Sequence, residues 1–146
     1  MDAATDIPAS LNDAIATEPL WLQAWILVLV VVHLAALLFV VGRRQGRWLV
    51  RFEPIAIVAS FAAAGLFMGW LYEQVGYVRL LGLAHLVCWG PAWVWVLSRR
   101  RTIGTGTLFG KYVHLYLVIA GASLLIDGID VVRYIAGDGA LLHRWS

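Results

Sequence analysis

Four long apolar segments constrain the fold of this 146-residue chain more than any other feature. They cover residues 20–41, 54–76, 80–97 and 112–136, the third being the shortest. A helix of roughly 20 residues crosses the hydrocarbon layer of a bilayer, and a backbone in lipid must satisfy its own hydrogen bonds. Hydrophobic residues make up 62% of the chain, more than a core of this size buries. The sequence therefore predicts an all-α, polytopic membrane protein.

Basic residues gather in two of the three connections between these segments, and the second connection contains only Arg79. The two basic loops contain Arg43, Arg44, Arg47, Arg51, Arg99, Arg100, Arg101 and Lys111. Cytoplasmic loops are enriched in Lys and Arg, so we expect both loops in the cytoplasm and both termini outside, N-out and C-out. Because most of the basic residues lie in two short loops, the net charge of +2 gives no basic face for nucleic acid.

We expect one transmembrane domain over residues 20–137, with short extracytoplasmic tails at 1–19 and 138–146. The first tail is acidic and lacks the basic start of a signal peptide. Ser10 followed by Asp13 resembles a capping box, which predicts a short helix over residues 11–17. Pro19 then sets the start of the first membrane helix.

Short connections make consecutive helices antiparallel neighbours, which predicts an up-and-down four-helix bundle. Gly65 and Gly69 form a small-residue pair of the kind that lets membrane helices approach closely. We expect this face to pack within the bundle, with a contact between subunits as the alternative. Gly90 and Pro91 are expected to kink the third helix, because proline removes a backbone donor.

Ionisable residues inside the apolar segments are the strongest pointers to function, because a bilayer penalises them. At roughly 100° per residue, the polar residues of the fourth segment share one helix face. They are Tyr116, Ser123, Asp127, Asp130 and Tyr134. Counted from the surface anchors Arg79 and Arg133, His85 and Asp127 each lie six residues inward, roughly 9 Å. His85 and Asp127 can therefore meet at one depth.

We therefore predict a polar cluster that opens outward. Its members are Glu73, His85, Asp127, Asp130 and Arg133. Arg133 follows Asp130 at i+3 and is expected to pair with it. The alternative is structural, with Asp130 and Arg133 paired at the headgroup level and Asp127 bonded to His85 or a tyrosine. A metal ion on His85 and Asp127 is a weaker candidate, because no short metal-binding motif is present.

Histidines in three of the segments raise the question of a haem held between two helices. His33 and His114 differ by roughly 9 Å in axial position, and His85 lies in the opposite leaflet from His114. No pair is well matched, so we expect no cofactor, with haem as the alternative. We expect His33 to be a core histidine bonded to a neighbour, and His143 to be solvated in the outer tail.

We expect the chain to act as an accessory, interaction or scaffold subunit, because it is short, has a small-residue face and has no nucleophile motif. One alternative is an oligomeric channel or transporter for protons, ions or a small solute that uses Asp127 and His85. A second is a haem- or metal-binding redox protein. An enzyme is the less expected class. The expected partners are the lipid bilayer and either further copies or a larger complex, in a bacterial inner membrane.

Overall fold

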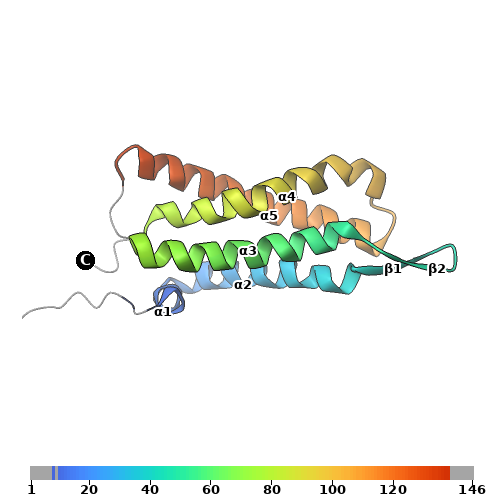
Figure 1. Ribbon diagram of the computed structural model, residues 1–146, viewed down its shortest axis with the longest axis horizontal. Helices are drawn as coiled ribbons and strands as arrows, with labels where there is room; N and C mark the ends of the chain where they lie inside the picture. The colour runs from blue at the N-terminus through green and yellow to red at the C-terminus, as the bar shows by residue number, and fades with distance from the viewer. Residues whose placement is uncertain (1–7, 9, 139–146) are drawn as a thin grey trace, which may run out of the picture.

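The structure, a computed structural model, describes Pro8 and residues 10–138. Its elements are α1 (Leu11–Ala16), α2 (Leu20–Ala35), η1 (Ala36–Phe39), β1 (Val41–Arg44), β2 (Arg47–Val50), α3 (Phe52–Val75), η2 (Arg79–Leu81), α4 (Gly82–Ile103) and α5 (Leu108–Ile135). The prediction of four helices long and apolar enough to cross a membrane is confirmed: α2 with η1, α3, η2 with α4, and α5. In Figure 1 these helices run along one axis, and successive ones point in opposite directions.

The bundle has two different ends (Figure 1). At one end α1 begins, α3 leads into η2, and α5 finishes; we call it the carboxylate end, because Asp130 and Asp138 lie there. The other end carries β1, β2 and residues 104–107, and we call it the hairpin end. Near the carboxylate end, the predicted cap of α1 is confirmed, since the Ser10 side chain accepts a hydrogen bond from the backbone N–H of Asp13.

The first connection forms a β-hairpin that the sequence analysis did not predict. Strands β1 and β2 pair antiparallel, with Val41 opposite Val50 and Arg44 opposite Arg47. Gln45 and Gly46 form the turn with φ angles of 51° and 79°. Two-residue hairpin turns of this kind need positive φ at both positions, which glycine adopts without strain. Figure 1 shows the hairpin projecting beyond the ends of α2 and α3.

Two helices extend further than the apolar segments. The predicted third segment stops at residue 97, whereas α4 continues through the arginines of residues 99–101 to Ile103. Likewise α5 begins at Leu108 and includes Lys111, with the Thr107 side chain as its cap. Long basic side chains favour helix and keep their charged heads in water while the backbone stays helical. α4 also continues on both sides of Pro91, so the proline does not end the helix.

Apolar side chains from all four long helices meet in the middle of the bundle. The cluster nearer the hairpin end includes Val32, Ala36, Ile57, Val96, Phe109, Tyr112, Val113, Tyr116, Leu117 and Ala120. A second cluster joins Leu29, Ala64 and Trp89. Many other large apolar side chains point outward, among them Leu27, Leu38, Leu66, Val118, Leu125 and Ile135. This outward apolar surface is what lipid chains cover in a membrane protein.

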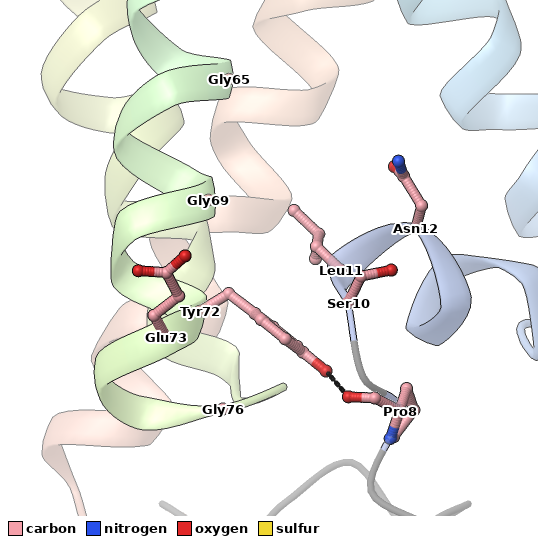
Figure 2. A pocket seen from close by; sticks show the side chains of 9 residues that line it. All are labelled: Pro8, Ser10, Leu11, Asn12, Gly65, Gly69, Tyr72, Glu73 and Gly76. Carbon is pink, nitrogen blue, oxygen red and sulfur yellow. Dashed lines mark hydrogen bonds between the residues drawn. The ribbon is translucent and has the colours of Figure 1, made fainter.

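The prediction that Gly65 and Gly69 pack within the bundle is wrong. A Cβ at either position would meet no heavy atom within 4 Å. α3 buries a different face, on which Ile57, Ala64 and Leu71 recur every seven residues. Gly65 lies roughly 100° around the helix from Ala64 and so points elsewhere. Both glycines line an open groove between α3 and the segment that leads into α1 (Figure 2).

Candidate functional site

The predicted contact between His85 and Asp127 is present. The His85 Nδ1 atom lies 2.8 Å from Asp127 Oδ2, which joins α4 to α5 inside the apolar part of the bundle. The two helices come close here because Gly82 is buried against Asp127: a Cβ on Gly82 would lie 3.0 Å from Asp127 Cβ and 3.1 Å from its Cα. Glycine at position 82 therefore permits the approach that puts the imidazole and the carboxylate within hydrogen-bonding distance.

This pair has the chemistry of an acid–base couple. An ionised carboxylate only accepts hydrogen bonds, so the Nδ1 atom of His85 carries the proton between them. Ser123 lies one turn before Asp127 on α5. Its hydroxyl donates to the same Oδ2 atom at 3.5 Å. The side chains of His85 and Asp127 are only 18% and 16% exposed. Most of the surface of both side chains is therefore covered by the helices around them.

Aromatic rings continue the site into the core. The His85 ring stacks on Trp89 with centroids 4.0 Å apart, and Trp89 also contacts the ring of His33 at 4.3 Å. Phe61 stacks on His33 at 4.9 Å, and Tyr116 meets it edge-on at 5.4 Å. Spacing along the chain does not predict that His33 and His85 both contact one tryptophan. Their contact with Trp89 follows from how three helices pack.

His33 is fully buried, and the prediction that it is a core histidine bonded to a neighbour is confirmed. Its Nδ1 atom lies 2.7 Å from the carbonyl oxygen of Leu29. A carbonyl only accepts, so Nδ1 bears the proton and Nε2 carries the lone pair. His114 makes the equivalent bond to the Gly110 carbonyl at 2.8 Å.

The packing around these histidines bears on the haem and metal alternatives. A porphyrin beside His33 would have to displace the rings of Trp89, Phe61 and Tyr116. Among residues 10–138 and Pro8, no group of three or more His, Cys, Asp and Glu side chains is placed to hold a metal ion. His143 lies outside the described residues.

The ion pairs at the carboxylate end differ from the predicted ones. Asp130 pairs with Arg79 at 2.8 Å instead of with Arg133, and Arg79 also reaches Asp138 at 3.0 Å. Arg133 pairs with Asp138 at 2.9 Å. Asp130 faces the start of α4, where η2 holds Arg79, whereas the Arg133 side chain is 54% exposed and points outward. Gly137, with a φ of 110°, turns the chain so that Asp138 comes back to both arginines.

The prediction that Glu73 belongs to this cluster is wrong. Glu73 is exposed and lies along the groove beside Gly69 and Tyr72, whose hydroxyl donates to the Pro8 carbonyl at 2.7 Å (Figure 2). It follows the buried Leu71 by two residues, which is roughly 200° around a helix, so it points away from the bundle.

At the hairpin end, one basic residue of the two loops has a carboxylate partner among the described residues. Arg99 pairs with the buried Glu53 at 2.6 Å, an acidic residue that the sequence analysis did not select. The Arg51 side chain lies over the Phe109 ring at 4.5 Å, and Arg100 donates to the Leu97 carbonyl. Five other basic side chains at this end are also exposed: Arg43, Arg44, Arg47, Arg101 and Lys111. The described part of the chain gives them no ion pair.

No protein-family model, no curated protein and no solved structure matches the chain.

Proposed function

We propose that this chain is a small proton-translocating membrane protein, in which the His85–Asp127 pair takes up and releases the proton. The observation that carries the proposal is the 2.8 Å contact between an imidazole and a carboxylate inside a bundle of apolar helices. Ionisable residues at such positions are costly and mark proton relays and ion pathways. Imidazole is also the side chain that exchanges protons most readily near neutral pH.

The surroundings of the pair support an opening at the carboxylate end. Arg79, Asp130 and Asp138 form a charged network there, and their side chains are between 23% and 39% exposed. Charged groups of this kind keep water close to the entrance of the site. Asp127 lies one helical turn further in than Asp130 on α5, so a proton arriving from this network meets the pair next.

In this proposal the carboxylate end faces the outside of a bacterial inner membrane and the hairpin end faces the cytoplasm. The basic side chains at the hairpin end support this orientation, since positive loops stay on the cytoplasmic side. The pair would then be loaded from outside.

The test is proton flux into liposomes that contain the purified chain, driven by a pH gradient. We expect Asp127→Asn to lower the flux at least about tenfold, because the amide cannot accept the proton. Asp127→Glu keeps the carboxylate and should restore part of the flux.

Glu73→Gln is the matched control, since it removes a carboxylate near the same end that lies outside the pair. It should leave the flux unchanged. Equal flux in the native chain and in Asp127→Asn, or no flux in the native chain, contradicts the proposal. Thermal midpoints of each variant separate a lost relay from a lost fold.

One observation favours a second candidate, an interaction subunit of a larger membrane complex or homo-oligomer. Gly65 and Gly69 face outward along an open groove, and small residues let another helix approach closely. The liposome experiment separates the two candidates. Absence of flux from the native chain, together with a partner subunit that co-purifies from native membranes, would favour this second function.

A further inference from the structure

Three buried polar atoms, carried by aromatic side chains that pack together, have no hydrogen-bond partner in the described part of the chain. They are His33 Nε2, Trp89 Nε1 and Tyr116 Oη. The three side chains come from α2, α4 and α5, and each is at most 2% exposed. Buried polar groups are almost always hydrogen-bonded, because each one left unpaired costs free energy. Three such atoms on neighbouring side chains therefore indicate a partner that the described residues do not supply.

The three atoms belong to rings that pack against one another. The His33 centroid lies 4.3 Å from that of Trp89 and 5.4 Å from that of Tyr116. The other contacts of His33 are an apolar ring, Phe61, and the Leu29 carbonyl that holds its Nδ1–H. The unpartnered polar atoms therefore belong to His33 and to two rings that pack against it.

The donor and acceptor inventory identifies the class of ligand. His33 Nε2 is an acceptor, because the proton of the ring sits on Nδ1. The indole Nε1–H of Trp89 is only a donor, and the Tyr116 hydroxyl is both. A metal ion needs lone pairs and would be repelled by the indole N–H. Water has two donors and two acceptors, so it can accept from Trp89, donate to His33 and bond to Tyr116.

We infer that ordered water binds among His33, Trp89 and Tyr116, as a hydrated station inside the bundle. The station adjoins the candidate site, because the His85 ring stacks on Trp89. On the other side, Tyr112 lies one turn from Tyr116 towards the hairpin end and donates to the Val32 carbonyl. The inference of a water site depends only on the three buried polar atoms that have no partner among the described residues. Its role as the next step of the proton path from His85 and Asp127 rests on the proposed function.

The direct test is water-edited solid-state NMR of the full chain in a lipid bilayer with nitrogen-15 in the tryptophan indoles. The signal that disappears in Trp89→Phe identifies Trp89 Nε1. We expect this signal to gain intensity from water at short mixing times. Trp93 is the matched control, since its Nε1–H donates directly to the Leu117 carbonyl at 2.9 Å, and its signal should gain more slowly. A Trp89 signal that gains no faster than that of Trp93 overturns the inference.

The sign of a stability change gives a second test that does not depend on replacing Trp89. If the Tyr116 hydroxyl has no partner, Tyr116→Phe removes a desolvated group and raises the thermal midpoint. If it binds water, the same change loses a hydrogen bond and lowers the midpoint by a few degrees. Tyr112→Phe loses a direct bond to the Val32 carbonyl and should lower the midpoint in any case. A higher midpoint for Tyr116→Phe contradicts the bound water.

These results stand apart from the flux measurement. Water transfer to Trp89 in a native chain that carries no protons keeps the hydrated station and overturns the proposed function. Proton flux through a chain whose Trp89 indole receives no water transfer contradicts the hydrated station and leaves the His85–Asp127 proposal standing. If the native chain shows both proton flux and water transfer to Trp89, Tyr116→Phe should lower the flux while leaving the His85–Asp127 contact in place.

Discussion

The two ends of the bundle use arginine in different ways. At the carboxylate end, Arg79 and Arg133 both pair with carboxylates, and Arg79 joins η2 to Asp130 on α5. At the hairpin end, Arg99 pairs with Glu53, while five other basic side chains are exposed to their surroundings. The difference arises from the acidic partners: α5 and the residues after it supply Asp130 and Asp138, whereas the hairpin end has Glu53.

The neighbours of an arginine therefore determine whether its charge contributes to the stability of the fold or remains exposed. The paired Arg79 links η2 to α5 close to the His85–Asp127 contact. An exposed arginine contributes little to the fold, but its charge is available to water and to anionic lipid headgroups, and it sets orientation in the membrane. Removing Arg79 should therefore affect stability, and changes at the exposed arginines should affect it little.

The largest expected effect comes from the close approach of α4 and α5. Gly82→Val puts side-chain atoms where Asp127 Cα and Cβ already lie, so we expect a loss of about 3 kcal/mol in the free energy of unfolding, measured by denaturant titration in micelles. Gly65→Val is the control, because a Cβ there meets nothing within 4 Å. Similar losses in both variants would mean that the Gly82 contact does not hold the site together.

A smaller effect is expected from the paired arginines. Arg79→Gln leaves Asp130 and Asp138 without their shared partner, and both carboxylates are about one third exposed to solvent. We expect a loss of about 1–2 kcal/mol in stability by the same titration. Arg133→Gln removes a more exposed pair with Asp138 and should cost no more than about 0.5 kcal/mol. An equal loss of stability from the two changes would mean that the Arg79 pairs contribute no more than the more exposed Arg133 pair.

The smallest effect is expected at the hairpin. Arg44→Cys, made in a Cys88→Ala background, removes an exposed charge that has no ion pair in the described part of the chain. Its stability should stay within about 0.5 kcal/mol of the Cys88→Ala parent. In the proposed orientation, a membrane-impermeant maleimide should label it only from the cytoplasmic side. Labelling from the outside would reverse the assignment of the two ends.

Local pattern accounts for what could be predicted. The four helices follow from apolar length, and the α1 cap follows from Ser10 and Asp13. The contact between His85 and Asp127 follows from axial counting, since a helix rises by a constant amount per residue and both anchors lie at one end. These features depend on residues close in sequence or on distances measured along a single axis.

Rotation around each helix was harder to predict. The sequence predicts Gly65 in the bundle interior and Glu73 in the polar cluster, but the seven-residue repeat of Ile57, Ala64 and Leu71 turns both of them outward. Similarly, Arg133 is the nearer base to Asp130 in sequence, yet Arg79 is its partner in space. α3 has apolar and small residues on every side, so its sequence does not mark one face as buried.

By itself, the sequence determined that the chain is a set of four apolar helices with basic turns and a carboxylate pair on the last helix. Length, hydropathy and charge act locally and need no knowledge of neighbours. The tertiary structure alone decided which helix faces meet. Gly82 lets α4 approach α5, and Arg79 reaches Asp130. The side chains of His33, Trp89 and Tyr116 pack together, each with a buried polar atom that has no partner in the described part of the chain. Those contacts depend on the rotation and separation of whole helices, which are fixed only when all the side chains pack together.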